Sequence, residues 1–166
     1  MPFLRLPIFV GLLLLMVNCS TRTYYIVRHA DRVPNADAIT PAGVTRTRVL
    51  ADSLKSKGIQ RIFSTNTLRT RQTAQPLSEV ISVPITLYGA DTLAGFANFL
   101  KTQPNSLVVG HSNTILETAR ALGATPTATT IGDQEFDRLL IVTRKRQWFS
   151  PIRISVVEAR YGAAAH

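Results

Sequence analysis

The stretch YYIVRHADRVPN, residues 24–35, places charged side chains directly after a run that suits a buried strand. Aromatic and β-branched residues fill positions 24–27, and such residues favour β-structure. Arg28 and His29 follow without a spacer, and Arg32 comes shortly after. Charged side chains are seldom buried without a partner. Either the strand ends at the surface, or these charges gather around an anion.

Short apolar runs alternate with longer helical patterns along the rest of the chain, whose 166 residues suit one domain. This alternation predicts right-handed crossovers and a mostly parallel sheet. Thr40 is the expected cap of the first helix, and Ser112 or Asn113 that of the last. The expected strands are 24–27, 61–64, 85–88 and 106–110, and the expected helical segments are 40–58, 68–81, 92–102 and 114–123.

The last third of the chain changes character. RLLIVTR, residues 138–144, and IRISVVEA, residues 152–159, are strand-like runs joined by a basic turn, which predicts an antiparallel hairpin. The predicted fold class is therefore α/β: a three-layer sandwich with a mostly parallel central sheet, helices on both faces and a C-terminal antiparallel hairpin. We place this domain at residues 23–160. Ligands of such sheets bind at the carboxyl ends of strands, where Arg28 and His29 lie.

Two further segments bring similar side chains to that edge. The strand at 61–64 leads into a helix start that carries Arg69, and the strand at 106–110 is followed by His111. Guanidinium groups hold phosphate oxygens at two points and stabilise negative charge in a transition state. A neutral imidazole is a recognised covalent nucleophile. Histidines and arginines on adjacent strand ends therefore favour phosphoryl transfer.

Three motifs in this order resemble the histidine phosphatase, or phosphoglycerate mutase-like, superfamily. VRHADRVPN is similar to its Arg-His-Gly signature, with Ala30 in the glycine position. STNTLRTRQTAQP is similar to the stretch that bears its second phosphate-binding arginine, and VVGHSNT to its second histidine segment. The resemblance covers about residues 24–160 and is closest to short bacterial members.

The resemblance implies a role for each matching residue. His29 is the expected nucleophile, which becomes phosphohistidine. Arg28, Arg69 and His111 are expected to act in catalysis by holding the transferred phosphoryl group. Arg32 resembles an extra arginine of the acid-phosphatase branch, and Asn35 a phosphate-contacting asparagine of the mutase-like branch. The full set expected to bind phosphate is Arg28, Arg32, Asn35, Arg69 and His111.

The general acid departs from the family pattern. The acid-phosphatase branch has a carboxylate directly after the second histidine, but here Ser112 follows His111. The mutase-like branch has a glutamate farther along the chain, and Asp91 is the best-placed carboxylate for that role. Asp31 is closer to the nucleophile in sequence and is the alternative.

The first 19 residues read as a leader. Arg5 precedes an apolar run at 7–17, which is too short to span a bilayer but fits a signal peptide. Cys19 follows, and this arrangement resembles the lipidation site of bacterial lipoproteins. We expect export rather than a cytoplasmic location, with a lipid at Cys19 and residues 20–23 as the tether to the first strand. An uncleaved anchor, or a cleaved signal with Cys19 incidental, are the alternatives.

Composition limits the partners. The chain has 19 Lys and Arg against 10 Asp and Glu, a formal charge of +9, which indicates either a generally basic surface or an anionic ligand. No nucleic-acid-binding motif is present, and the single cysteine and three histidines show no metal-ligand spacing. We therefore expect no nucleic acid, metal or other cofactor.

The sequence predicts a metal-independent phosphohydrolase, a phosphomonoester or phosphohistidine phosphatase that works through His29. Its partner would be a small phosphorylated substrate or a phosphoprotein, and a membrane if Cys19 is lipidated. One alternative is a catalytically degenerate module that binds phosphorylated ligands. Another is a phosphoglycerate mutase-type phosphotransferase, although so short a chain leaves little sequence for an enclosing lid.

Overall fold

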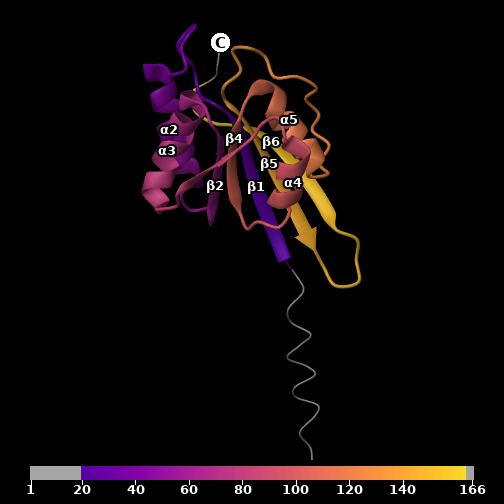
Figure 1. Cartoon of the computed structure of the whole chain (residues 1–166). Coiled ribbons are helices and arrows are strands. Elements are labelled where there is room, and N and C mark those ends of the chain that lie inside the picture. The colour runs from indigo at the N-terminus through magenta and orange to yellow at the C-terminus, as the bar shows by residue number, and fades with distance from the viewer. Residues whose placement is uncertain (1–19, 164–166) are drawn as a thin grey trace, which may run out of the picture.

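The computed structural model describes residues 20–163 and confirms the predicted α/β fold class (Figure 1). One six-stranded sheet has the order β3-β2-β4-β1-β5-β6. β1 to β4 are mutually parallel where they pair, and β5 and β6 are antiparallel additions. The elements are β1 (Ser20–Arg28), α2 (Pro41–Leu54), β2 (Arg61–Thr65), α3 (Leu68–Ile81), β3 (Ile85–Tyr88), α4 (Leu93–Leu100), β4 (Ser106–Gly110), α5 (Ser112–Ala121), β5 (Arg138–Arg146) and β6 (Arg153–Arg160).

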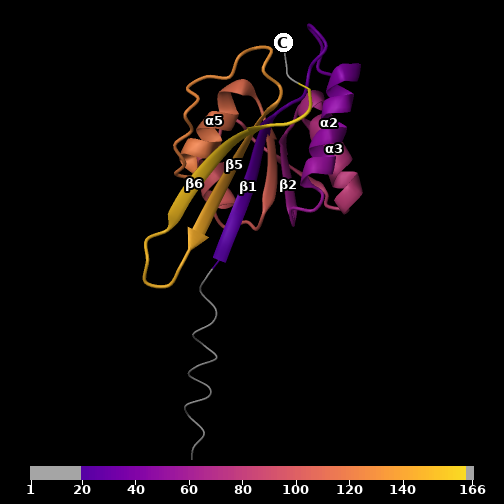
Figure 2. The same cartoon turned by 180° about the vertical axis from the view of Figure 1, so that it is seen from behind.

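Helices cover both faces of the sheet, α2 and α3 on one side and α4 and α5 on the other (Figures 1 and 2). β1 lies between two strands and supplies both cores. Tyr24 and Ile26 pack with α4 and α5, whereas Tyr25 and Val27 pack with α2 and α3. Successive strand residues point to opposite faces, so the fully apolar run at 24–27 is what a strand buried on both faces requires.

The parallel register brings the ends of three strands to one edge of the sheet. Arg28 at the end of β1 pairs with Gly110 at the end of β4, and Ser64 near the end of β2 pairs with Val109. The residues that follow these strands therefore meet at a single edge, as expected for the carboxyl ends of a parallel sheet.

Several element boundaries differ from the sequence prediction; α2, for example, ends at Leu54 and not at Gly58. β1 begins at Ser20, not Tyr24, because residues 20–23 pair with the end of β5; these residues are strand, not a free tether. The cap of α5 is His111 rather than Ser112 or Asn113. His111 has an extended backbone, and its N–H donates to Thr114 Oγ1 at 2.9 Å. The predicted leader, with Cys19, lies outside the described residues.

Candidate active site

His29 directly follows β1, and its side chain is fixed in one tautomer. The residue is 3% exposed, and its backbone N–H donates to the Gly110 carbonyl. Nδ1 lies 2.8 Å from the Ala30 carbonyl oxygen. A carbonyl only accepts, so Nδ1 carries the proton and Nε2 keeps its lone pair. Burial, with the charges of Arg28 and Arg69 nearby, lowers the pKa of His29 to about 4. The imidazole is therefore neutral at pH 7.

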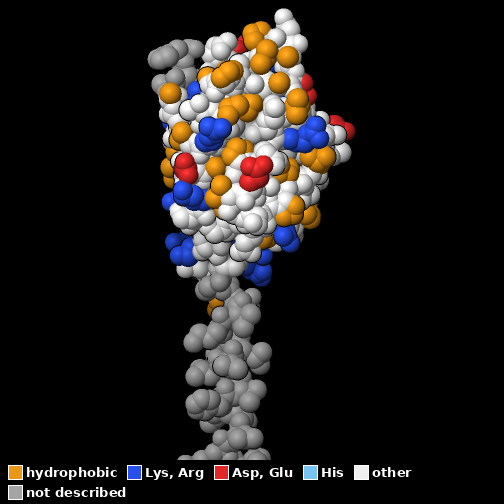
Figure 3. All heavy atoms as spheres, turned by 90° about the vertical axis from the view of Figure 1, so that its left-hand side faces the viewer, with side chains coloured by type: hydrophobic (Ala, Val, Ile, Leu, Met, Phe, Trp, Pro, Cys, Tyr) orange, Lys and Arg blue, Asp and Glu red, His pale blue; other side chains and the backbone are white. Residues whose placement is uncertain are grey.

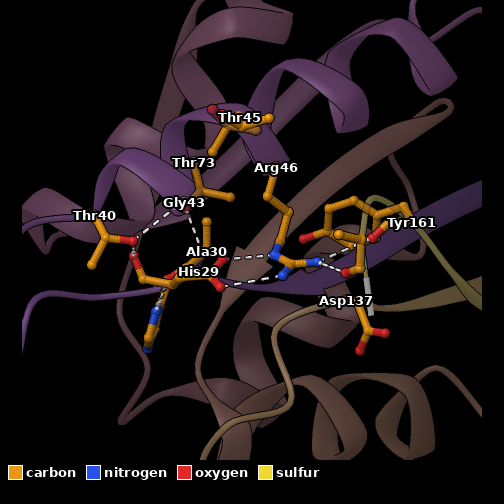
Figure 4. A network of polar contacts seen from close by, with 12 residues as sticks. His29, Ala30, Thr40, Gly43, Thr45, Arg46, Thr73, Asp137 and Tyr161 are labelled. Atoms are coloured by element: carbon orange, nitrogen blue, oxygen red, sulfur yellow. Dashed lines mark hydrogen bonds and ion pairs between the residues drawn. The ribbon is translucent and has the colours of Figure 1, made fainter. Parts of the chain in front are cut away.

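The backbone after His29 is held from two helices (Figure 4). The Ala30 N–H donates to Thr73 Oγ1 of α3 at 2.9 Å. The Asp31 carbonyl accepts from the Thr40 N–H at 2.8 Å. Gly43 of α2 packs so close that a Cβ atom there would lie 2.5 Å from the Asp31 carbonyl oxygen. This close approach fixes the loop that carries the candidate nucleophile.

Arg28 is buried beside His29 and retains an unused donor. One guanidinium nitrogen, Nη1, donates to the carbonyls of Gly132 and Asp133 at 2.8 and 2.9 Å. The guanidinium carbon lies 4.5 Å from the centroid of the Phe136 ring, a distance typical of a cation–π contact. The Arg28 Nε has no hydrogen-bond partner within residues 20–163. Because an arginine cannot lose its proton in a protein, this N–H is available to an anion.

Arg69 and His111 complete the cluster. The Arg69 Nη1 forms an ion pair with Asp37 at 2.8 Å, and its Nε is buried without a partner in the described chain. Its Nη2 lies 3.5 Å from His111 Nδ1, and His111 Nε2 lies 2.9 Å from Thr65 Oγ1. The ring centroids of His29 and His111 are 5.7 Å apart. Burial and the charge of Arg69 lower the pKa of His111. The imidazoles of His29 and His111 are therefore both neutral at pH 7 when no ligand is bound.

The structure thus brings together four of the predicted residues: Arg28, His29, Arg69 and His111. Arg32 is exposed beside them. With Arg28, Pro34, Asp133 and Gln134 it lines a hollow of about 300 Å³. Asn35 is exposed, and within residues 20–163 its side chain makes no hydrogen bond to the cluster.

Neither candidate acid contacts the cluster in the described structure. Asp91 is exposed in the turn after β3, the edge strand of the sheet, and shows no hydrogen bond or ion pair within residues 20–163. Asp31 is bound by Arg46. Burial acts to raise the pKa of Asp31, but the hydrogen bonds and charge of Arg46 outweigh it and hold that pKa below its usual value. A carboxylate kept ionised in this way is a poor general acid.

Several residues at the site were not singled out from the sequence. The segment 133–137 precedes β5 and folds over the site. Its Phe136 lies against both His29 and Arg28, and Asp133 lines the hollow beside Arg28. Asp37 orients Arg69. No local pattern marks these contacts, since each depends on a loop that returns from a distant part of the chain.

A comparison with protein families agrees with this geometry. Residues 24–90 match the family described as the histidine phosphatase superfamily (branch 1), and this range includes Arg28, His29 and Arg69. The matching segment covers less than half of the chain, and over these residues the chain resembles the histidine phosphatase superfamily. The sequence motifs had indicated the same superfamily, which is confirmed. A search of curated proteins gave no significant match.

Several solved structures share the histidine phosphatase fold of this chain. A Nakamurella multipartitia protein proposed to be the phosphohistidine phosphatase SixA is 20% identical, with a TM-score of 0.59, over 87% of this chain and 98% of its own. A mycobacterial glucosyl-3-phosphoglycerate phosphatase is 14% identical, with a TM-score of 0.59, over 82% of this chain and 97% of its own. A Plasmodium falciparum phosphoglycerate mutase is 18% identical, with a TM-score of 0.57, over 89% of this chain and 94% of its own. At these identities the likeness concerns the fold.

Proposed function

We propose that this protein is a metal-independent phosphohydrolase that transfers a phosphoryl group to His29 Nε2 and then to water. One observation carries the proposal. The bond from His29 Nδ1 to the Ala30 carbonyl leaves Nε2 with a free lone pair, beside Arg28, Arg69 and His111. This is a nucleophile held in place next to groups that bind an anion.

In the first step Nε2 attacks phosphorus and an N–P bond forms. The bond to the leaving-group oxygen or nitrogen breaks, and the leaving group departs with the electron pair and takes up a proton. The buried Nε atoms of Arg28 and Arg69 are free to donate to phosphoryl oxygens, where negative charge must be stabilised. A bound phosphate dianion would also raise the pKa of His111, since an opposite charge favours the cation. The imidazolium of His111 would then donate a further hydrogen bond.

In the second step water attacks the phosphohistidine. A P–O bond forms, the N–P bond breaks and its electron pair returns to Nε2. The attacking water releases a proton to solvent, and inorganic phosphate leaves. The Nδ1–H bond to Ala30 persists through both steps, because that proton is not exchanged with the substrate. The arginines neutralise the phosphate, so the sequence of steps requires no cation.

The substrate class we propose is a small phosphomonoester or a phosphohistidine. A hollow lined by Arg28, Arg32, Pro34, Asp133 and Gln134 adjoins the phosphoryl site. Its arginines and its aspartate offer positive and negative charge to a leaving group. Glucosyl-3-phosphoglycerate phosphatase and the protein proposed to be SixA share the fold, and their names state these two kinds of substrate. Because neither Asp91 nor Asp31 contacts the cluster in the described structure, a degenerate binding module is the competing function.

Turnover and trapping of the intermediate test this proposal. The protein should hydrolyse an aryl phosphate, and EDTA should leave the rate unchanged. Rapid quenching at alkaline pH should trap an acid-labile phosphoramidate at His29. His29→Ala should abolish both adduct and turnover. His111→Ala should lose on the order of 10²–10³ in rate, the effect of removing one donor to a developing negative charge, and still form the adduct.

Three results would contradict the assignment: a label that maps to His111, a His29→Ala variant that keeps most of its activity, or EDTA inhibition reversed by zinc or magnesium. Phosphate binding without turnover, in a protein that is folded, would indicate the degenerate binding module instead.

A further inference from the structure

The end of the domain opposite the candidate active site is strongly basic. Parallel strands begin at this end, and the helices that precede them end there. Lys and Arg side chains gather around it in Figure 3. We call these residues the basic end: Arg22, Lys55, Lys57, Arg61, Lys101, Arg144, Lys145, Arg146 and Arg153.

The hairpin of β5 and β6 projects from the basic end (Figure 1), and its tip carries two aromatic residues. The tip comprises residues 147–152, between β5 and β6. Trp148, Phe149 and Ile152 are 37%, 96% and 42% exposed. The Trp148 and Phe149 rings lie 5.3 Å apart between centroids. Scattered exposed apolar residues are common, but adjacent ones on a projecting tip mark an interaction site.

Phe149 also adopts a backbone conformation that disfavours large residues. Its φ is +58°, a region in which glycine is the usual residue and a bulky side chain is strained. The fold therefore accepts both strain and the near-complete exposure of a phenyl ring at one position. Such outliers point to a function at that position.

The start of the described chain lies beside this tip. Ser20 pairs with Arg146, the last residue of β5. Residues 1–19 therefore join the fold at the basic end, and their sequence contains the apolar run 7–17 and Cys19. A lipid on Cys19, or an anchor formed by the run, would place a membrane at this end.

We propose that residues 147–152 and the surrounding basic residues contact an anionic lipid bilayer, with the candidate active site facing away from it. Aromatic side chains concentrate at membrane–water interfaces, and Lys and Arg near the surface are attracted to anionic headgroups. β1, nine residues long, separates the two ends by roughly 30 Å.

Helix electrostatics account for only part of the basic end. Cations stabilise helix C-termini, which covers Lys55 and Lys101, and Lys55 also pairs with Asp52. Lys145, Arg146 and Arg153 lie on strands, are exposed, and form no ion pair within residues 20–163. These hairpin charges, next to Trp148, are the ones a bilayer surface would use.

Trp148 is the only tryptophan in the chain, so its fluorescence tests the proposal directly in the full-length protein. Vesicles of phosphatidylcholine with phosphatidylglycerol should shift the emission to the blue and protect it from iodide. Lipids brominated on the acyl chain should quench it. Pure phosphatidylcholine should require a higher lipid concentration, because the basic residues then lack a partner.

Matched variants distinguish the effect of charges at the hairpin from the effect of the overall positive charge of the protein. The double variant Lys145→Ser with Arg146→Ser should bind the vesicles more weakly. The lipid concentration that gives half of the fluorescence change should rise about fivefold for each charge removed. Arg48→Ser with Arg71→Ser removes the same charge from exposed positions of α2 and α3 and should leave the response unchanged. Phe149→Ser should reduce quenching by brominated lipid.

Several outcomes would overturn the proposal. One is that the full-length protein binds the vesicles while iodide still quenches the Trp148 fluorescence and brominated lipid does not. Another is equal weakening by the two charge pairs. A third is a blue shift that appears without lipid and depends on protein concentration, which would assign the tip to a second protein. Phosphatase activity enters none of these measurements, so they stand apart from the proposed function.

Discussion

Arg46 holds Asp31 through two hydrogen bonds, from Nε to Oδ2 at 2.6 Å and from Nη2 to Oδ1 at 3.2 Å. The same guanidinium donates through Nη1 to the carbonyls of Tyr161 and Ala163. Arg46 therefore lies between the loop that follows His29 and the C-terminal segment, and the His29 ring points away from it (Figure 4). Two segments far apart in sequence are joined at the position that carries the candidate nucleophile.

Arg46→Met should destabilise the protein by about 2–4 kcal/mol. The Arg46 and Asp31 side chains are only 6% and 21% exposed, and removing one partner leaves a partly buried charge uncompensated. Arg48→Met, at an exposed position of the same helix, should change stability by less than about 0.5 kcal/mol. Urea unfolding compares the two. Equal losses would mean that the Asp31 pair contributes nothing.

Gly43→Ala should lower both stability and turnover, because the new methyl group would meet the Asp31 carbonyl at 2.5 Å and displace the loop after His29. Gly95 in α4 provides the control, since a Cβ there meets nothing within 4 Å. Gly95→Ala should stabilise the protein by about 0.5–1 kcal/mol, the difference in helix propensity, with turnover unchanged. An active, stable Gly43→Ala variant would refute the close approach.

Acid should destabilise the folded protein partly through His29. Its folded-state pKa is about 4, whereas an unfolded histidine titrates near 6.5. Between these values the unfolded chain binds a proton that the folded chain excludes, so stability falls as pH drops, by up to about 3 kcal/mol. His29→Gln should reduce the difference between unfolding free energies at pH 7 and pH 5. An unchanged difference would show that the imidazole is not buried as a neutral group.

Much of the fold is predictable because its signals are local. Thr40 and Pro41 begin α2 as their capping preferences indicate, and α3 covers 68–81 as predicted, with Pro76 inside it. The apolar runs mark the parallel strands because these are buried on both faces. Residues 20–23 are polar and resemble no buried strand; they extend β1 only because β5 lies alongside.

The core of the candidate site is predictable for a topological reason. Arg28 is the last residue of β1, and His29 and His111 directly follow β1 and β4; parallel strands of this kind share an edge. Pairings between loops are different. Asp31 and Arg46, or Asp37 and Arg69, meet only after the chain has folded, and nothing near either residue in sequence indicates its partner.

Arg28→Lys should reduce kcat/KM by on the order of 10²–10³, because an ammonium cannot donate to the loop carbonyls and to phosphate with the geometry of a planar guanidinium. The Nη1 bonds to Gly132 and Asp133 and the free Nε are both lost. Arg71→Lys, on the exposed side of α3, should have no effect. The two variants are compared by steady-state kinetics on an aryl phosphate. Near-normal kcat/KM in the Arg28→Lys variant would exclude Arg28 from phosphate binding.

Asp91→Asn tests the general acid through the leaving group. An acid is needed for alkyl phosphates, whose alkoxide is a poor leaving group. If Asp91 supplies that proton, the hydrolysis of alkyl phosphates should slow by roughly 10²–10⁴, whereas activated aryl phosphates should be little affected. Asp133→Asn is the comparison, because Asp133 lines the hollow beside Arg28. A selective loss of alkyl phosphate hydrolysis in the Asp133→Asn variant alone would assign the general acid to Asp133. If neither variant shows this loss, neither aspartate is the general acid. A phosphohistidine substrate would then fit best, because an imidazole, with a pKa near 6.5, leaves readily at pH 7 without a protein carboxyl group.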